Sequence, residues 1–560
     1  MESISQKNPV AYFCAEYGLE SSLPFYAGGL GVLAGDTLKA AVDDKLPMVG
    51  IGLLYRGCDA KQVITQDGEQ DEAQILVDPL TLGLEPVLLE GQPVFIKVHL
   101  TSVEVWLQCW QKKLSDTVTL YLLDSETEQN HYNERALTHS LYSGTEEWQF
   151  KQQLLLGIGG VKLLHTLGIH PAVYHVNEGR PAFLHWQLIR SYMDLHGMTF
   201  EEACSAAKEK TVYTNHTLVG AGNPGYPAGL LTTYGAYYAD KMGVSVDRLV
   251  QDGIENGDTT HFQITRFALN TSRKANGVSA LHSRLSQQQW PEYDWTSITN
   301  GVHMPTWQRY DIVTASSSAN WKTNLWNTHQ FAKQELADFV HARSGFRYDH
   351  TKLVISWARR ITGYKQLDSL FADVARFKAI LSNPERPVQL LVAGKAHFGD
   401  SASKSVLHDI MKIFGTELSG LALFVPDYNL ELARHMVQGS DVWLNTPEYG
   451  KEASGTSGMK AMANGVLNCS VADGWVPELD WRNKGWILDH TRISQSLYET
   501  LEQQIVPDFY DRQMVDFESQ IMVPETWVSR MRNGIEESGK FSAQRMLHQY
   551  KEEFYGSTKI

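Results

Sequence analysis

Cysteine is scarce in this sequence, and its arrangement argues against two kinds of site. The chain has 560 residues and only five cysteines, at positions 14, 58, 109, 204 and 469. Their number is odd and none forms a Cys-x-x-Cys pair, so neither a disulfide framework nor a zinc site is indicated. No His-Glu-x-x-His or comparable cluster occurs, so we expect no metal. Free thiols suit a reducing compartment, and we predict a cytoplasmic protein.

Positive charge and long apolar runs are lacking as well. Lys and Arg total 49 against 64 Asp and Glu, which gives a net charge of −15. Nucleic acids and anionic membranes attract basic proteins, so we expect neither as a partner. No apolar run approaches the length of a membrane span, and the first residues lack the apolar core of a signal peptide. A neutral substrate is fully compatible with this composition.

The sequence does contain a regular alternation of strand-like and helical segments. In the first half, buried strands are predicted at 10–16, 48–56, 117–123, 172–177 and 211–215, and an antiparallel hairpin at 94–113. In the second half, strands are predicted at 353–358, 388–394, 421–425, 441–445 and 465–471. A chain of this length exceeds one hydrophobic core. The alternation therefore predicts α/β domains with mainly parallel sheets.

Unusual polar residues of the second half come directly after these strands. Arg359, Arg360 and Lys365 follow the first strand, and Asp427 and Tyr428 follow the third. The carboxyl ends of parallel strands face the ligand crevice of an open sheet. A solvated basic patch explains the three cations alone, but it does not explain polar residues after successive strands. We therefore predict that they converge on a cleft.

The most informative stretch is residues 452–460, which read EASGTSGMK. It lies between a predicted strand and a predicted helix start, where free N–H groups favour a phosphate. Gly455 and Gly458 let the backbone approach a ligand closely. Lys460 then suits either a point-charge clamp or a Schiff base to a phosphorylated aldehyde such as pyridoxal phosphate. A capped helix with a solvated lysine explains the stretch equally well when it is taken alone.

Together with other motifs, this stretch resembles the cofactor loop of the α-glucan (glycogen/maltodextrin) phosphorylases, in particular the short bacterial type. Further matches, in the family's order, are YAGGLGVLAGD, HVNEGRPAF, TNHT, ITNGVHMPTW and RRITGYK. The resemblance implies an α/β protein of the GT-B fold, with two Rossmann-like domains facing across a cleft. We expect an N-terminal domain for the glucan over 1–305 and a pyridoxal phosphate-binding domain over 306–520. A helical segment over 521–560 is expected to pack back on the domains.

The resemblance also implies the reaction. A retaining glycosyltransferase would move the terminal glucose of an α-1,4-glucan (glycogen, starch or maltodextrin) to inorganic phosphate, giving glucose 1-phosphate. Pyridoxal 5'-phosphate is the implied cofactor, and a homodimer is left open. The implied cofactor contacts are Lys460, Thr456, Gly29, Arg359, Tyr428 and Trp307. The implied substrate contacts are Glu452, Ser454, Gly455, Asn300, His216 and Leu30. The implied catalytic residues are Lys460, Arg360, Lys365 and His216, with Arg360 and Lys365 on the substrate phosphate.

Two other functions compete with this interpretation. A nucleotide-sugar-dependent glucan synthase of the same fold would place a lysine two positions before the first glycine of the GGLG turn, where this chain has Tyr26. Lys460 would have no role in such an enzyme. A non-catalytic glucan-binding protein would have no use for a buried Lys460 beside a basic cluster. Both are less consistent with the residues than a phosphorylase.

Overall fold

The protein forms two compact units. The computed structural model describes residues 3–57, 61–73, 76–255, 258–397, 399–516 and 521–556. The first unit contains residues 1–59, 74–299 and 546–560, and the second contains 60–73 and 300–545. The chain therefore passes between the units four times, at 59/60, 73/74, 299/300 and 545/546.

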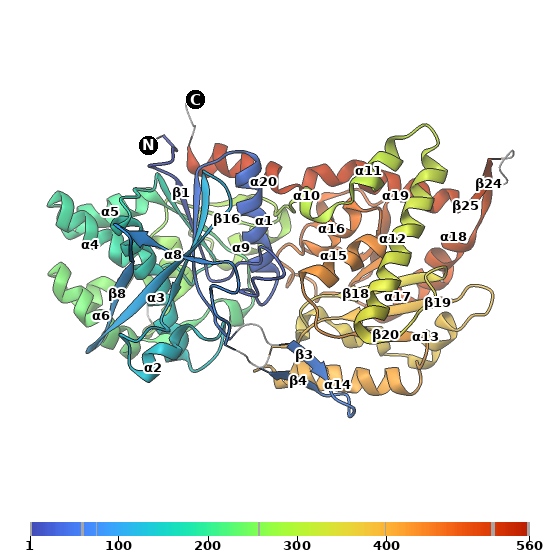
Figure 1. The fold of residues 1–560 in the computed structure, drawn as a ribbon, viewed down its shortest axis with the longest axis horizontal. Coiled ribbons are helices and arrows are strands. Elements are labelled where there is room, and N and C mark those ends of the chain that lie inside the picture. The colour runs from blue at the N-terminus through green and yellow to red at the C-terminus, as the bar shows by residue number, and fades with distance from the viewer. Residues whose placement is uncertain are drawn as a thin grey trace. The chain divides into compact units, whose positions relative to one another are not determined.

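The first unit is built on a large sheet that is mostly parallel (Figure 1). Its parallel strands are, in spatial order, β17 (Trp295–Ser297), β16 (Lys274–Gly277), β12 (Thr211–Thr214), β11 (Val173–Asn177), β1 (Val10–Cys14), β2 (Met48–Leu53) and β10 (Val118–Asp124). Antiparallel strands β9 (Val103–Lys113), β8 (Phe95–Leu100) and β5 (Glu85–Pro86) extend one edge. Every residue of β1 and β2 is buried, as expected for strands covered on both faces. The chain order reverses between β1 and β11, which makes their carboxyl ends a topological switch point.

Helices and a small second sheet complete the first unit. Its helices are α1 (Gly29–Asp43), α2 (Tyr132–Arg135), α3 (Glu146–Thr166), α4 (Leu184–His196), α5 (Phe200–Lys210), α6 (Ala228–Met242), α7 (Val246–Val250), α8 (Ile264–Asn270) and α9 (Ala280–Gln289). The small sheet consists of β13 (Gly225–Pro227), β15 (Asp258–Gln263) and β14 (Ile254–Glu255). Residues of α20 (Ala543–Tyr550) and the turn after it also belong here. The Tyr555 hydroxyl contacts Nδ1 of the buried His175 at 2.7 Å.

The second unit contains a wholly parallel sheet. Its strands are, in spatial order, β20 (Ala422–Val425), β19 (Val388–Ala393), β18 (Leu353–Ala358), β21 (Val442–Asn445), β22 (Leu467–Val471) and β23 (Gly485–Leu488). Numbered along the chain, this is the order 3-2-1-4-5-6 of a doubly wound Rossmann-like sheet. The switch point lies between β18 and β21, so a ligand crevice is expected at their carboxyl ends.

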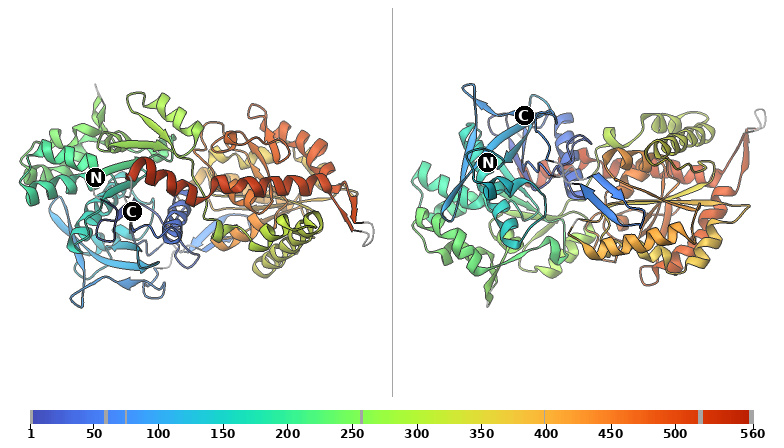
Figure 2. Two further views of the ribbon diagram at one scale, coloured as in Figure 1. Left: turned by 90° about the horizontal axis from the view of Figure 1, so that it is seen from above. Right: turned by 60° about the horizontal axis from the view of Figure 1, so that its bottom comes forward.

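Helices cover both faces of this second sheet, and a hairpin from early in the sequence joins them. The helices are α10 (Met304–Trp307), α11 (Tyr310–Ser317), α12 (Trp321–Ser344), α13 (Val374–Leu381), α14 (Ser401–Gly415), α15 (Leu430–Gly439), α16 (Ser457–Ala463), α17 (Ile493–Thr500), α18 (Val506–Tyr510) and α19 (Glu525–Ser538). The hairpin β3 (Lys61–Ile64) and β4 (Gln70–Ala73) is coloured blue beside α14 in Figures 1 and 2. A second hairpin comprises β24 (Gln513–Asp516) and β25 (Ile521–Val523).

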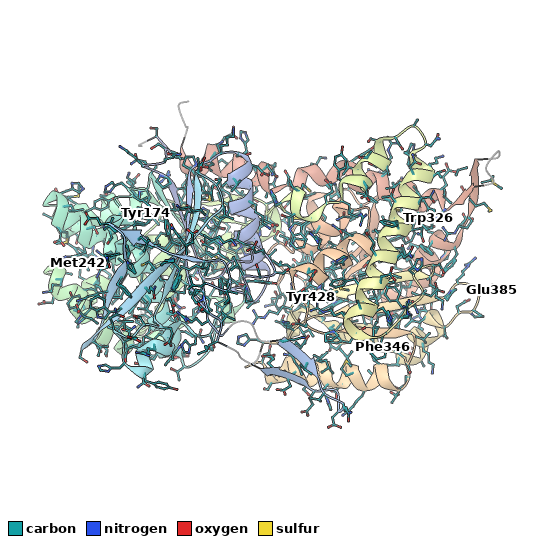
Figure 3. The ribbon with its side chains drawn as sticks, viewed as in Figure 1. Tyr174, Met242, Trp326, Phe346, Glu385 and Tyr428 are labelled. Carbon is teal, nitrogen blue, oxygen red and sulfur yellow. The ribbon has the colours of Figure 1, made fainter. Side chains whose placement is uncertain are left out.

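A buried ion pair fixes α12 to the two strands that flank the second switch point. Asp441 precedes β21, and its carboxylate contacts Lys333 Nζ at 2.6 Å and His329 Nε2 at 2.9 Å. The same carboxylate accepts the Val354 N–H of β18 at 2.8 Å. All three side chains are fully buried, so removal of one partner would leave an uncompensated buried charge. Trp326 of α12, labelled in Figure 3, packs nearby against Phe509.

The mixed α/β architecture with parallel sheets is confirmed, with local differences. The predicted strands are present in both units, with ends that differ by up to three residues. Residues 367–380, whose apolar side chains keep helical spacing throughout, form a 3₁₀ turn at 367–371 followed by α13, because Gln366 adopts φ +49° and Asp373 caps a new start. Strand β23 and the β24–β25 hairpin had no prediction. None of the helices in the described residues is long and apolar enough to cross a bilayer.

Candidate active site

Arg359 follows β18 directly and lies at the switch point of the second unit. Its guanidinium donates a hydrogen bond to the Leu444 carbonyl of the neighbouring strand β21, and its Cζ lies 5.1 Å from the Trp357 ring centre. Only 8% of its surface is exposed, and burial lowers its pKa, although a guanidinium stays charged. Its Nε has no hydrogen-bond partner among the described residues. A buried donor without a partner is a contact point for an anion.

Lys365 and Glu452 form an ion pair at the same edge of the sheet. The Lys365 ammonium contacts the Glu452 carboxylate, and their side chains are only 12% and 9% exposed. Burial alone would lower the pKa of Lys365. The charge of Glu452 more than offsets this effect, so the pKa of Lys365 lies above its ordinary value. Arg360 is only half-buried. The cations that follow β18 therefore differ in setting: one is buried, one is paired and one is partly exposed.

Lys460 lies over the ring of Trp307, whose backbone carbonyl accepts two side-chain hydrogen bonds. Its Nζ is 3.9 Å from the centre of the Trp307 ring, in α10. The Trp307 carbonyl accepts hydrogen bonds from Asn464 at 2.9 Å and Gln438 at 3.1 Å, so α10 is fastened to α15 and to the residue after α16. Lys460 is 7% exposed. The alternative of a solvated lysine is therefore wrong.

The loop that precedes α16 is locked against the turn after β22. Asp473 accepts the Glu452 N–H at 3.0 Å, and the Trp475 N–H donates to the Ser454 carbonyl at 3.1 Å. Gly455 adopts φ +81°, which favours glycine, and a Cβ at Gly474 would lie 2.2 Å from the Ser454 carbonyl oxygen. Burial raises the pKa of Asp473 to about 6, and its backbone hydrogen bonds oppose that shift.

These groups fit a phosphorylated ligand such as pyridoxal phosphate. The buried Ser454 hydroxyl has no hydrogen-bond partner in the described ranges, like Arg359 Nε. The Thr456 side chain makes no capping bond to α16. The Tyr428 hydroxyl, on the residue labelled in Figure 3, donates to the Ala358 carbonyl at 3.4 Å. Donors and cations therefore outnumber carboxylates around the loop, as an anion requires.

The first unit has a polar cluster at its own switch point. His216 Nε2 contacts the Asn177 side-chain oxygen at 2.6 Å, and its backbone N–H donates to Glu178 at 2.9 Å. Burial lowers the pKa of His216 to about 3, so its ring is neutral near pH 7. Burial raises the pKa of Glu178 to about 7, and Glu178 adopts φ +68°. His216 is therefore a neutral hydrogen-bonding group in this setting.

The glycine turn at the start of α1 is held by Glu16. Its carboxylate accepts the N–H groups of Ala27 at 2.7 Å and Gly28 at 3.1 Å. A Cβ at Gly31 would lie 2.5 Å from Tyr26, so packing requires glycine there. A Cβ at Gly29 would meet no described atom within 4 Å, so packing does not explain that glycine. Gly29 is exposed and the adjacent Leu30 is half-buried.

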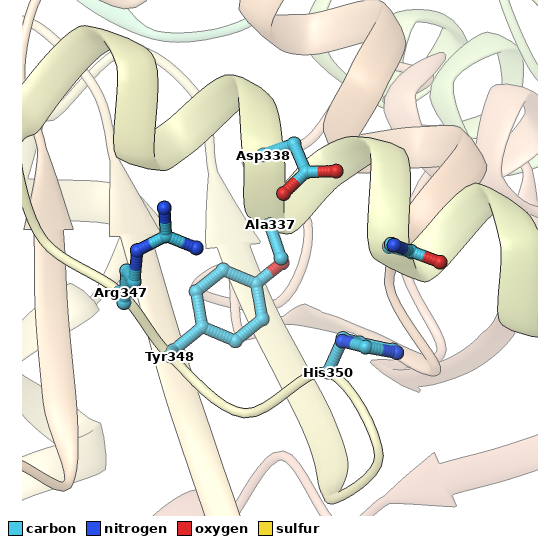
Figure 4. A pocket seen from close by; sticks show the side chains of 6 residues that line it. Ala337, Asp338, Arg347, Tyr348 and His350 are labelled. Carbon is cyan, nitrogen blue, oxygen red and sulfur yellow. The ribbon is translucent and has the colours of Figure 1, made fainter.

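A separate pocket of about 160 Å³ lies elsewhere in the second unit (Figure 4). It is lined by Gln334, Ala337, Asp338, Arg347, Tyr348 and His350. These residues belong to α12 and to the segment before β18, and the Tyr348 ring points toward Ala337. None of the predicted site residues lines this pocket. Ligand crevices of doubly wound sheets lie at the carboxyl ends of strands, so we do not assign the active site to it.

Two pairs of the predicted site residues of the second unit are in contact with each other. The contacts join Lys365 to Glu452, Lys460 to Trp307, and Tyr428 to the strand that precedes Arg359. Asn300 is buried, and Oδ1 of its side chain has no partner in the described part of the chain. Gly29, Leu30 and His216 belong to the first unit.

The sequence interpretation missed two buried acids. Glu16 and Asp473 each follow a strand. The strand-end rule that selected Arg359 could therefore have found them.

The chain is similar to one protein family and to several known proteins. The family described as carbohydrate phosphorylase matches residues 308–480, which contain the basic cluster and the loop before α16. The maltodextrin phosphorylase of Thermococcus litoralis is 35% identical over 98% of this chain and 70% of its own length. The glycogen phosphorylase of Mycobacterium tuberculosis is 33% identical over 98% of this chain and 70% of its own length. That of Aquifex aeolicus is 32% identical over 98% of this chain and 86% of its own length.

The chain belongs to the carbohydrate phosphorylase family. The family and the enzyme class predicted from the sequence, a glycosyltransferase, are thereby confirmed. The relatives named here are phosphorylases, and the nucleotide-sugar-dependent synthase is not favoured. A non-catalytic binding protein is equally disfavoured, because carbohydrate phosphorylases are enzymes.

Proposed function

We propose that this phosphorylase is a retaining α-1,4-glucan phosphorylase that uses pyridoxal 5'-phosphate. It transfers the terminal glucosyl unit of glycogen, starch or maltodextrin to inorganic phosphate and releases glucose 1-phosphate. One observation carries the proposal. The buried cations Arg359 and Lys460, together with Lys365 in its ion pair, belong to the segments that follow the two strands at the switch point of the second unit. Such a cluster is suited to two phosphate groups, which repel one another without fixed positive charge.

Lys460 is proposed to hold the cofactor covalently. The Trp307 ring would pack against it, with Tyr428 nearby, and its phosphate would be held by Thr456, by Gly29 of the first unit and by Arg359, whose Nε lacks a partner among the described residues. When bound, pyridoxal phosphate would supply a phosphate group beside that of the substrate.

Arg360 and Lys365 are proposed to bind the substrate phosphate. Glu452 keeps Lys365 charged and oriented, because the two form an ion pair in a buried setting. A phosphate held in this way gives a proton to the glycosidic oxygen as the bond from that oxygen to the anomeric carbon breaks. A phosphate oxygen then bonds to the anomeric carbon on the vacated face, so the product is the α anomer. No pair of catalytic carboxylates is needed, unlike in a glycosidase.

The remaining assignments are part of the same proposal. Glu452, Ser454, Gly455, Asn300, His216 and Leu30 are proposed to contact glucose. His216 would do so as a neutral group. We propose the GT-B class for the fold, with a glucan-binding domain over 1–305, a cofactor-binding domain over 306–520 and a helical segment over 521–560.

One experiment tests both the cofactor and the reaction. Borohydride reduction and peptide mass spectrometry of the active protein should place a pyridoxyl group on the peptide with Lys460, and Lys460→Ala should have no activity. The active protein should form glucose 1-phosphate from maltodextrin and phosphate, and should extend a maltodextrin primer with glucose 1-phosphate. ADP-glucose and UDP-glucose should give no extension. An unmodified Lys460 in active enzyme, or extension from a nucleotide sugar alone, would overturn the proposal.

A further inference from the structure

The hairpin β3–β4 brings two buried glutamines into the second unit. Its flanking residues belong to the first unit, whereas residues 60–73 belong to the second. Much of the hairpin surface is exposed, including Lys61, Val63 and Gln66. Gln62 and Gln70, in contrast, have only 2% and 8% of their surface exposed. Buried amides of this kind need partners for both the oxygen and the nitrogen.

Gln62 bridges two loops of the second unit with one amide. Its Nε2 donates to the Gly394 carbonyl at 2.9 Å, just after β19. Its Oε1 accepts the Asp427 N–H at 2.7 Å, just after β20. The amide carries a donor and an acceptor on one planar group, so an apolar side chain of similar length, such as Met, can make neither contact.

Gln70 pairs with the backbone of a single residue. Its Nε2 donates to the Ala396 carbonyl at 2.8 Å, and its Oε1 accepts the Ala396 N–H at 3.0 Å. The Gln62 amide also donates to Gln70 Oε1 at 2.7 Å. The two glutamines thus form one connected set of hydrogen bonds over residues 394–396.

Residues 394–396 in turn support the loop that carries the cations. The Arg359 N–H donates to the Ala393 carbonyl at 3.2 Å, and the Ile361 N–H donates to the Lys395 carbonyl at 3.0 Å. A Cβ at Gly394 would lie 2.2 Å from the Arg359 carbonyl oxygen, so the two loops are in close contact. Asp427, the second residue that Gln62 contacts, adopts φ +60° and precedes Tyr428. The hairpin therefore contacts the segments after β19 and β20, and the first of these segments holds the backbone of Arg359 and Ile361.

We propose that Gln62 and Gln70 are positioning residues for the Arg359–Arg360 loop, and that the hairpin thereby sets the geometry of the phosphate site. The inference rests on the proposed function, because that function assigns these two arginines to phosphate groups. It adds that the geometry of that site depends on residues 60–73, which lie in the sequence between two segments of the first unit. Neither glutamine touches the reacting atoms in this proposal.

The test compares Gln62→Met with Gln66→Met in the full chain. The substitution is the same, but Gln66 is exposed on the same hairpin. We expect the KM for phosphate to rise about tenfold in Gln62→Met, with the KM for maltodextrin within about twofold of normal. The pyridoxal released per chain by alkali should fall. Gln66→Met should match the parent protein in all three quantities.

Other results separate this proposal from a purely structural role and from a failed function. A lower melting temperature with unchanged phosphate KM and pyridoxal content would overturn it. If the parent protein held no pyridoxal, the proposed function would fail. The positioning role of the hairpin would then be tested by the rise in melting temperature that saturating inorganic phosphate causes. A rise in the parent that is lost in Gln62→Met supports positioning by the hairpin. No rise in the parent, or an equal rise in both proteins, overturns it.

Discussion

Among single residues, burial has opposite consequences for the cations and the acids of the two switch points. Arg359 keeps its charge although burial lowers its pKa, because a guanidinium starts from such a high value. The ordinary pKa of a glutamate is much closer to neutral pH, and burial raises that of Glu178 to about 7. Its neighbour His216 is kept neutral by the same effect. The first-unit cluster is therefore poor in charge and the second-unit cluster is rich in it.

Glu178 should make stability depend on pH. A glutamate ordinarily titrates near 4.5, but Glu178 does so at about 7 in the folded protein. Between these values the folded protein holds a proton that the unfolded chain has released, so the free energy of unfolding falls as pH rises. The contribution is complete below pH 4.5 and lost above about 7, and it amounts to about 3 kcal/mol. Urea unfolding between pH 4.5 and 8 should show this slope weakened in Glu178→Gln.

An exposed glutamate provides the control for this effect. Glu128 lies on the surface of the first unit, so Glu128→Gln should retain the slope of the parent protein. An unchanged slope in Glu178→Gln would mean that Glu178 is ionised in the folded protein over the whole range.

Among the structural elements, the contact between the loop before α16 and the turn after β22 should be the most sensitive to backbone change. Gly474 adopts φ +58°, and an added Cβ would lie 2.2 Å from the Ser454 carbonyl oxygen. The left-handed conformation alone costs about 1–2 kcal/mol for alanine. We expect Gly474→Ala to lower the free energy of unfolding by at least that amount. It should also lower kcat/KM by about tenfold or more, because Ser454 and Glu452 must shift.

A glycine with room for a side chain serves as the comparison for Gly474. Gly415 ends α14, and a Cβ there would meet no described atom within 4 Å. Gly415→Ala should leave kcat/KM unchanged and stabilise the protein slightly, by up to about 1 kcal/mol. Equal kinetics in Gly474→Ala and the parent would show that the turn does not hold the loop.

Sequence patterns predicted the elements better than the contacts between them. Strands β18 and β19 were predictable because their apolar runs are bounded by polar residues and helical spacing. Arg359 was predictable from the strand-end rule. The pairing of Lys365 with Glu452, or of Gln62 with Gly394, was not, because 87 and 332 residues separate the partners and no local pattern encodes them. The family resemblance supplied the role of Lys460, which spacing alone left open.

For the whole molecule, the helical turn over residues 551–555 contributes to the core of the first unit. The Tyr555 hydroxyl pairs with His175 Nδ1 at 2.7 Å, and both residues are buried. Tyr555→Phe leaves that nitrogen without this partner, which costs about 1–3 kcal/mol. Urea unfolding should detect the loss. Tyr132→Phe is the control, because Tyr132 is 85% exposed, and it should change stability by less than about 0.5 kcal/mol. Equal stability of the two variants would show that the Tyr555–His175 hydrogen bond does not stabilise the protein.

The four crossings between units also affect how the protein folds during translation. Gln62 emerges 332 residues before its partner Gly394, and His175 emerges 380 residues before Tyr555. At about 5–20 residues per second, those intervals last on the order of tens of seconds. His175 can form its contact with Tyr555, and Gln62 its contact with Gly394, only after the residues between the partners have been made. These two contacts of early segments are therefore among the last to form during synthesis.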